Sequence, residues 1–150
     1  MHLPMSSSTG PILPASRSLR WMGFAACAWA VLFGAPHAWW ALGISAGFPG
    51  GEANYHRFMS STWRYIYDVV VVVMSGAGVW VAWQLMRPPA PRRWIARTAA
   101  WIASGMLTLR GVAGMVVDGA ADPVWWPTFL VGGILFGGVA VLSRRGRAAA

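Results

Sequence analysis

The sequence predicts an all-α fold, an antiparallel bundle of four transmembrane helices with a disordered N-terminal tail. The first observation behind this prediction is composition, because the chain is 57% hydrophobic and 11% charged, with a mean hydropathy of +0.50. A soluble domain carries about a quarter charged residues, so this chain lacks the polar surface that water requires. The second observation is four apolar segments, each near the roughly 20 residues that a helix needs to span a bilayer. Backbone groups in lipid must be satisfied internally, so helices are the expected form.

The predicted membrane domain covers residues 21–142 and is expected to be a single domain. Its helices are predicted at approximately 21–44, 63–86, 94–117 and 124–142. Tryptophans fall at the helix ends, where the membrane interface favours amphipathic aromatic rings. These tryptophans are Trp63, Trp94, Trp125 and Trp126. Short connections predict antiparallel neighbours, and the longest connection, residues 45–62, is predicted to be an external loop.

Two polar tails flank this domain. Residues 1–20 are rich in serine and proline without periodicity, which predicts a disordered cytoplasmic tail. Residues 143–150 are predicted to form a basic cytoplasmic tail. The first apolar segment could be a cleaved signal peptide, but it continues through Leu42 and more apolar segments follow, which favours a retained helix.

Arginine placement predicts the orientation of the helices. All 12 basic residues are arginines, and most of them lie on one predicted side of the membrane. These are Arg17, Arg20, Arg87, Arg92, Arg93, Arg97, Arg144, Arg145 and Arg147. The other side holds Arg57, Arg64 and Arg110 together with all 4 acidic residues. Because cytoplasmic segments carry an excess of positive charge, both termini are predicted to lie in the cytoplasm. No nucleic-acid-reading motif accompanies the net charge of +8, so nucleic acid is not an expected partner.

Small residues recur every four positions along three of the predicted helices. They are Ala26, Ala30, Gly34 and Ala38, then Gly78 and Ala82, and finally Gly133 and Gly137. Such stripes let helices approach closely in lipid. The sequence leaves open whether they serve the bundle itself, a homo-oligomer or a membrane-protein partner. The single cysteine, Cys27, excludes an intramolecular disulfide.

Three ionisable residues on three different helices are predicted to lie at one depth in the membrane. His37 and Arg110 are each about seven residues, or roughly 10 Å, inside the predicted outer boundary, and Asp68 is about five residues, or roughly 8 Å, inside it. Ionisable groups in a membrane face the protein interior or a wet cavity. We expect Asp68 to pair with Arg110 and His37 to hydrogen-bond nearby. Arg64, four residues before Asp68 on the same helical face, is the competing partner.

The same region contains a candidate pocket. Pro36 removes a backbone hydrogen bond beside His37 and is expected to kink the helix, which would open room for a ligand. Trp39, Trp40 and Tyr65 are the other candidate lining residues, although aromatic residues near the boundary also serve as interface anchors. The polar cluster either holds helices in register or binds a substrate. No cofactor or metal is expected, because the 3 histidines lack metal-ligand spacing, and no catalytic residue is assigned.

Three sequence motifs resemble a known family. HAWWALG, at 37–43, resembles the His-x-aromatic-Trp-Ala-Leu-Gly motif of small bacterial four-helix membrane proteins catalogued as domain of unknown function 3995. LRGVAG, at 109–114, is similar to the second signature of that family, and WWPTFLVGGILF, at 125–136, stands where its last helix would begin. The similarity covers about residues 21–142 and implies a four-helix bundle in the bacterial inner membrane. The family carries no established activity, so the resemblance implies no ligand or reaction.

Three classes of function remain open. A non-enzymatic helper or structural membrane component is favoured, because catalytic groups are sparse and small-residue stripes are abundant. The alternative is an outward-facing protein or enzyme that binds a small molecule or a lipid with His37, Asp68 and Arg110. The third is a small dimeric transporter, disfavoured because the cytoplasmic halves of the helices contain no ionisable residue beyond the boundary arginines. The alternative requires that these three side chains line a cavity rather than close on one another.

Overall fold

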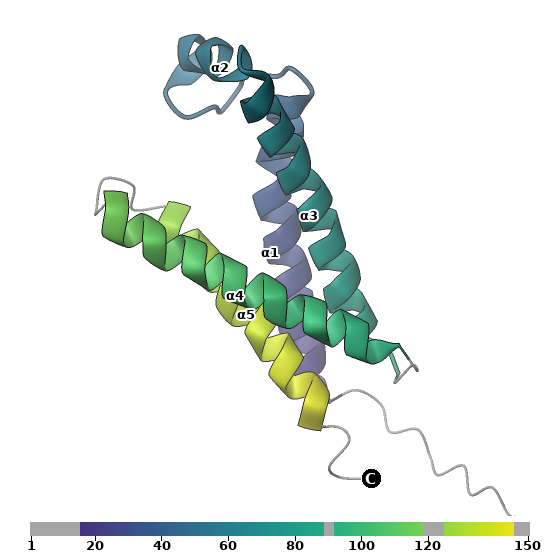
Figure 1. The fold of residues 1–150 in the computed structure, drawn as a ribbon. Helices are drawn as coiled ribbons and strands as arrows, with labels where there is room; N and C mark the ends of the chain where they lie inside the picture. Colours follow the sequence, from purple (N-terminus) through teal and green to yellow (C-terminus); the bar gives the residue numbers. More distant parts are fainter. Residues whose placement is uncertain (1–15, 89–91, 119–124, 146–150) are drawn as a thin grey trace, which may run out of the picture.

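The computed structural model describes residues 16–88, 92–118 and 125–145. Within these ranges the chain forms helices and no strand (Figure 1). The helices are α1 (Arg17–Ala41), α2 (Gly51–Met59), α3 (Thr62–Met86), α4 (Arg93–Asp118) and α5 (Trp125–Arg145). The predicted all-α fold class is confirmed. All of these helices except α2 are long and apolar enough to span a membrane, so the chain has the architecture of a multi-pass membrane protein.

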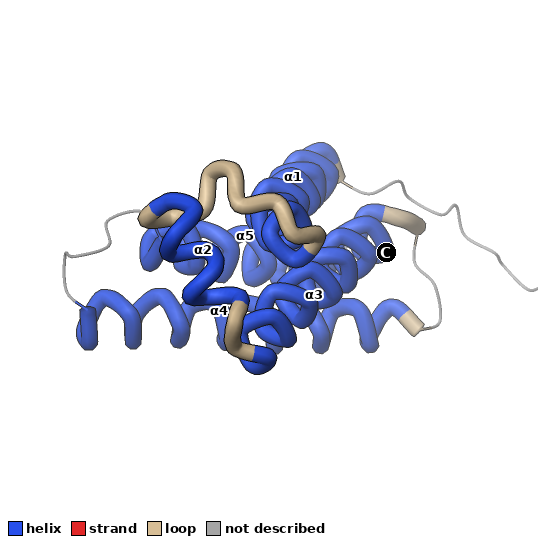
Figure 2. Tube along the Cα trace, turned by 90° about the horizontal axis from the view of Figure 1, so that it is seen from above, coloured by secondary structure: helices blue, strands red, loops and turns tan. Residues whose placement is uncertain are grey.

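The four long helices form two antiparallel pairs. α1 packs extensively against α3, and α4 packs extensively against α5. The two pairs also contact one another, chiefly through α1 with α5 and α3 with α4. They lie closest where α1 begins and α5 ends, and they diverge toward the opposite end, which carries α2 (Figure 1). We refer to that opposite end as the α2 end. Seen from above in Figure 2, α2 extends from α1 and α3 toward the side occupied by α4 and α5.

Three helix boundaries correct the sequence prediction. The Ser16 side chain accepts a hydrogen bond from the Leu19 N–H at 3.3 Å, so α1 begins at Arg17 and residues 17–20 are helical rather than part of the predicted tail. Gly43 adopts a left-handed conformation with φ +93°, which ends α1 at Ala41 rather than near residue 44. At the other end of the chain α5 continues to Arg145, into the predicted basic tail. The remainder of both predicted tails, residues 1–15 and 146–150, lies outside the described residues.

The short helix α2 corrects the prediction that residues 45–62 form a loop. It has 9 residues and one buried side chain, that of Tyr55, so it lacks the apolar run that identified the longer helices. A charge signal is present, because Glu52 in the first turn and Arg57 in the last turn suit the helix dipole. The Tyr55 hydroxyl donates to the carbonyl oxygen of Trp40 at 3.0 Å, and the Phe48 ring contacts both residues. These contacts fasten α2 to the end of α1.

Small residues bring the helices of each pair close together. Ala30 and Gly34 are buried in α1, and a β-carbon added to Gly34 would lie 2.6 Å from the Cβ of Ser75 in α3. A β-carbon at Gly133 of α5 would lie 3.1 Å from the backbone nitrogen of Thr108 in α4. These two positions of the predicted stripes therefore serve contacts within the chain, as close helix approach in lipid requires.

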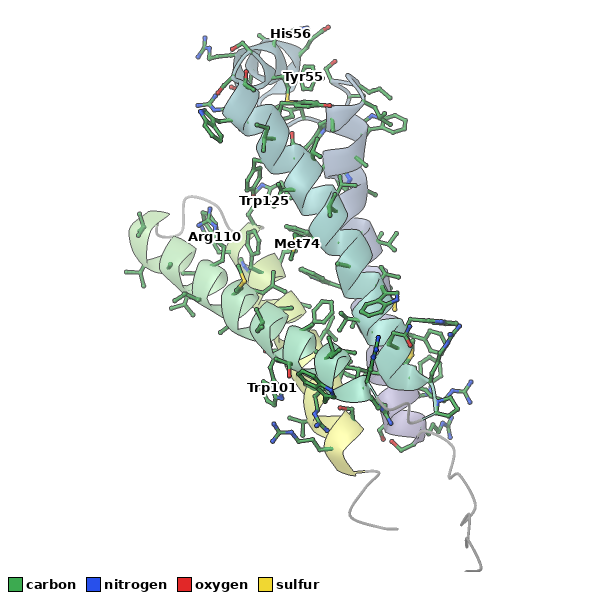
Figure 3. All side chains as sticks on the ribbon, turned by 45° about the vertical axis from the view of Figure 1, so that its right-hand side comes forward. Tyr55, His56, Met74, Trp101, Arg110 and Trp125 are labelled. Atoms are coloured by element: carbon green, nitrogen blue, oxygen red, sulfur yellow. The ribbon has the colours of Figure 1, made fainter. Side chains whose placement is uncertain are left out.

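Large apolar side chains cover the outside of the long helices (Figure 3). Met74 of α3 and Trp101 of α4 are two of the exposed ones. A soluble protein would bury a surface of this extent, whereas acyl chains accommodate it. The buried core lies where the two helix pairs meet and includes Phe136, Leu85 and Val139.

Candidate functional site

A buried histidine–aspartate pair joins α1 to α3 near the α2 end. Nδ1 of His37 lies 2.6 Å from Oδ1 of Asp68, and the two residues are 5% and 1% exposed. A carboxylate oxygen accepts, so Nδ1 of His37 donates in this hydrogen bond. Gly34 lies three residues before His37, and the close approach of α1 and α3 at this glycine lets the short Asp68 side chain reach the imidazole.

Aromatic rings surround the imidazole of His37. The ring centroids of Phe33, Trp40 and Tyr67 lie 5.4, 5.2 and 6.0 Å from the imidazole centroid, and that of Trp125 lies 6.1 Å from it. Nε2 of His37 and Oδ2 of Asp68 have no hydrogen-bond partner among the described residues. Because buried polar atoms are normally hydrogen-bonded, these two atoms mark a place where a polar group would be stabilised.

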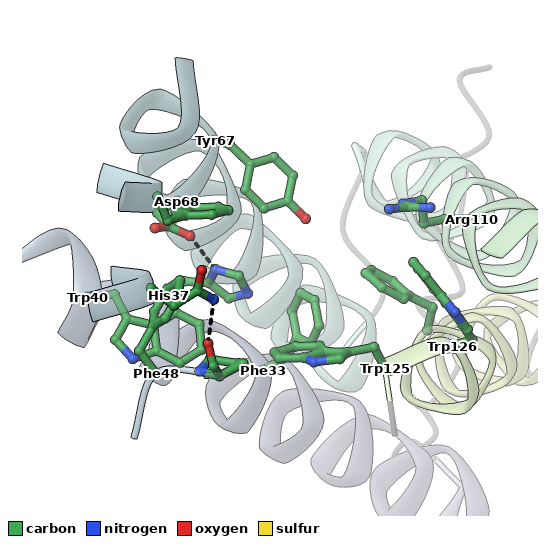
Figure 4. A pocket seen from close by; sticks show the side chains of 13 residues that line it. Phe33, His37, Trp40, Phe48, Tyr67, Asp68, Arg110, Trp125 and Trp126 are labelled. Carbon is green, nitrogen blue, oxygen red and sulfur yellow. Dashed lines mark hydrogen bonds and ion pairs between the residues drawn. The ribbon is translucent and has the colours of Figure 1, made fainter. Parts of the chain in front are cut away.

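The pair lines a pocket of about 280 Å³ at the α2 end, between the two helix pairs (Figure 4). α1 and α3 form one wall, α4 and α5 form the other, and residues of the segment 48–58 complete the lining. The described lining residues are Phe33, His37, Trp40, Phe48, Pro49, Asn54, Phe58, Tyr67, Asp68, Arg110, Trp125, Trp126 and Phe129. A mainly aromatic cavity with a few polar groups is the usual form of a small-molecule site.

Arg110 of α4 faces the histidine–aspartate pair across this pocket (Figure 4). Its Cζ lies 4.6 Å from the ring centroid of Trp126 and 5.7 Å from that of Phe129, so the guanidinium stacks on aromatic faces. The Tyr67 hydroxyl points toward Arg110 from α3 (Figure 4). The contact with the aromatic rings uses none of the hydrogen-bond donors of the guanidinium, so these donors can bind a polar group in the pocket.

The predicted ion pair between Asp68 and Arg110 is wrong. In the described part of the chain, the hydrogen-bond partner of Asp68 is His37, and Arg110 forms no ion pair with Asp68. The physical reason is the divergence of the two helix pairs, which separates α3 from α4 at the α2 end (Figure 1). α1 stays packed against α3 there, so the imidazole of His37, rather than Arg110, lies within hydrogen-bond distance of the Asp68 carboxylate.

The other candidate residues divide between this pocket and other places. Trp40 lines the pocket as predicted, whereas Trp39 and Tyr65 are exposed and do not line it. Pro36 lies inside α1 and lines a separate cavity of about 300 Å³ with Phe33 and Trp125. In the same way, Arg64 is not a partner of Asp68, because its Cζ lies over the Phe58 ring, 4.9 Å from the centroid.

Several pocket residues were not identified from the sequence. Trp125 and Trp126 were interpreted as interface anchors, and Phe48, Asn54 and Phe58 lie in the segment that was predicted to be a loop. Tyr67, next to Asp68, lines the pocket, whereas the predicted Tyr65 does not. The signal that could have found the tryptophans is the adjacent pair Trp125–Trp126, because neighbouring residues of an α-helix point about 100° apart, so the two rings cannot face the same surroundings.

The site can bind and orient a polar group. His37, held by Asp68, presents Nε2, which accepts a hydrogen bond when the imidazole is neutral and donates one when it is protonated. Arg110 provides a permanent positive charge suited to a carboxylate or a phosphate. The described lining residues include no serine, threonine or cysteine for His37 to activate as a nucleophile. No group of three metal-ligating His, Cys, Asp or Glu residues occurs within residues 16–88, 92–118 and 125–145.

Comparisons of the chain with protein-family models, with curated proteins and with solved structures found no match. All three motifs that resemble the four-helix family contribute lining residues to the pocket. These residues are His37 and Trp40, then Arg110, and finally Trp125, Trp126 and Phe129.

Proposed function

We propose that this multi-pass membrane protein binds a ligand with a carboxylate or phosphate group in the pocket at the α2 end. The observation that carries the proposal is that His37, Asp68 and Arg110 line one cavity. A purely structural cluster would close on itself, whereas here the cation stands across the cavity from the histidine–aspartate pair. The proposed function is ligand binding, and no reaction is assigned.

The guanidinium of Arg110 favours an anionic ligand. The Asp68 carboxylate hydrogen-bonds His37, and among the described residues it forms no direct ion pair with Arg110. Arg110 can therefore form a bidentate, charge-assisted pair with a carboxylate or phosphate. Nε2 of His37 supplies a further donor when the imidazole is protonated. The aromatic walls lower the local dielectric and strengthen these interactions.

A structural membrane component without a ligand is the second candidate function. It is favoured by the His37–Asp68 hydrogen bond, which joins α1 to α3 without a ligand. The two candidates differ at Arg110, which makes no ion pair in the described part of the chain. A substitution there lowers affinity for a ligand under the first candidate and leaves function unchanged under the second.

Glycerol phosphate is the probe that tests the proposal. Purified protein in neutral detergent is expected to bind it saturably, followed by tryptophan fluorescence, because Trp40, Trp125 and Trp126 line the pocket. Arg110→Gln is expected to weaken binding at least about tenfold, since a hydrogen bond to a charged group contributes about 1.5–3 kcal/mol. Arg144→Gln is the matched control, because Arg144 stacks on Trp101 with its Cζ 5.5 Å from the ring centroid and does not line the pocket. Equal affinity in the two variants, or no saturable binding of either glycerol phosphate or acetate to the wild type, would contradict the proposal.

We also propose that the protein belongs to the bacterial four-helix family that its motifs resemble and lies in the inner membrane with both termini cytoplasmic. The distribution of arginines supports this orientation, which turns the α2 end outward. In a Cys27→Ser background, Glu52→Cys is expected to react with a membrane-impermeant maleimide added to intact cells. Ser18→Cys, at the start of α1, is expected to react only after the cells are opened. The reverse pattern would overturn the orientation.

A further inference from the structure

We propose that the ligand is an anionic lipid, drawn from the bilayer leaflet at the α2 end, whose acyl chain lies in an apolar groove between α3 and α4. The inference rests on the proposed function, because it places the lipid headgroup in the pocket between His37 and Arg110. It adds the chemical class of the ligand and the route by which the ligand reaches the pocket.

The groove is a second cavity, of about 250 Å³, to which all four long helices contribute. No charged side chain occurs among its described lining residues. Val70 and Met74 line it from α3, and Met106 and Leu107 line it from α4. It adjoins the pocket, and three residues line both cavities: Phe33, Tyr67 and Phe129.

The groove opens sideways, toward the space that acyl chains occupy around a membrane helix. Met74 on α3 and Met106 on α4 line it and are 58% and 63% exposed. Figure 3 shows Met74 on the side of α3 that faces α4. Flexible methionine side chains adapt to chains of irregular shape. A hydrophobic ligand can therefore enter from the bilayer without crossing water.

The length and polarity of the adjoining pocket and groove match one lipid. The residues of α3 that line the groove extend from Tyr67 to Val81, a length of about 21 Å at the rise of an α-helix. One leaflet of the hydrocarbon core is roughly 15 Å thick, half of the full core, so the groove accommodates a chain of leaflet length. The charged groups all lie at the end nearest α2, and the apolar lining follows. This order, a cation and then an apolar groove, is complementary to an anionic headgroup and its chain.

The positive charge of Arg110 decides between a lipid and other occupants. A helix of a partner protein or of a second copy could cover the apolar groove, but its apolar face offers no anion to the guanidinium. A free phosphate would fill the pocket and leave the groove unused. An anionic lipid satisfies both parts of the cavity at once, so it is the occupant to which the observations point.

Native mass spectrometry of the purified full chain tests the inference with three probes: oleoyl lysophosphatidylglycerol, oleoyl lysophosphatidylcholine and glycerol phosphate. The anionic lysolipid is expected to bind at least about tenfold more tightly than the zwitterionic one. Ala77→Phe places a ring in the groove at an exposed position and is expected to weaken lysophosphatidylglycerol binding at least about tenfold while glycerol phosphate binding stays unchanged. Val73→Phe is the matched control, because Val73 is an exposed residue of α3 that does not line the groove.

The outcomes separate the two proposals. Lysophosphatidylglycerol binding that is lowered by Arg110→Gln and by Ala77→Phe, but not by Val73→Phe, would support both. Binding of glycerol phosphate that depends on Arg110, together with lysolipid binding that Ala77→Phe leaves unchanged, would overturn the lipid inference and leave the pocket as an anion site. Equal binding of the two lysolipids, or a second copy or a protein partner held across α3 and α4, would also overturn it. Failure of all three probes would overturn the proposed function as well.

Discussion

Replacing Asp68 with alanine is expected to lower the free energy of unfolding by about 3–5 kcal/mol, because removal of one partner leaves the other buried and unpaired. Asp68 and His37 are almost fully buried, and the residues around them are mostly aromatic. His37→Ala is expected to produce a loss of similar size, since it leaves the carboxylate without its donor. The measurement is equilibrium unfolding of the purified protein in mixed micelles, with helix content as the signal.

The double variant His37→Ala/Asp68→Ala distinguishes a coupled pair from two independent residues. Its free energy of unfolding is expected to fall by less than the sum of the decreases in the two single variants, because no unpaired buried group remains. Asp68→Asn keeps an oxygen that can accept the hydrogen bond from Nδ1 of His37. Its free energy of unfolding is therefore expected to fall less than that of Asp68→Ala. The exposed pair of Glu52 and His56, with Oε1 and Nε2 3.6 Å apart, supplies a matched control in which Glu52→Ala changes stability little. Additive losses for His37 and Asp68 would contradict the coupling.

The second large effect is expected at Phe136, in the part of the bundle where the two helix pairs meet. Phe136 is 2% exposed, and its Cζ lies 3.0 Å from the position that a β-carbon on Gly78 would occupy, so the ring of α5 reaches the backbone of α3. It also makes an edge contact with Trp29 of α1, with the ring centroids 6.2 Å apart. Phe136→Ala is expected to lower the free energy of unfolding by about 3 kcal/mol, because the surrounding side chains lose their dispersion contacts and a cavity remains.

A lipid-facing residue of the same helix provides the control for Phe136. Ile134 is 70% exposed, so Ile134→Ala removes few contacts and is expected to change the stability only slightly. Both variants are measured by the same unfolding titration. Losses of equal size at the two positions would mean that α5 does not join the two pairs through this ring, and the orientation of the pocket walls would then need another explanation.

The sequence was sufficient to predict the long helices, because each bilayer-spanning segment must be a long apolar run. α3 and α4 begin and end within one residue of their predicted bounds. The fixed rise of an α-helix predicted one shared depth for His37, Asp68 and Arg110, and all three line one pocket, but the rise says nothing about which groups touch. Helix α2 was missed because it has only 9 residues and one buried side chain, so it lacks the apolar run that identifies the long helices.

The identity of the ion-pair partner could not be predicted from depth. It depends on the rotation of each helix about its axis and on the angle between the helix pairs, both of which are set by side-chain contacts far along the sequence. Gly34 against Ser75 keeps α1 close to α3, and this contact brings His37 to Asp68. Arg110 is kept on the other wall by the stack on Trp126, a residue that the sequence pattern assigned to the membrane interface.

A density map of the purified protein in native lipid is the most direct measurement of the central claim, that a buried histidine–aspartate pair and an arginine face one another across a ligand pocket. We expect the Asp68 carboxylate to lie at Nδ1 of His37, Arg110 to lie over Trp126, and elongated density to run from the pocket into the groove between α3 and α4. Arg110 in an ion pair with Asp68, with the cavity closed between them, would contradict it.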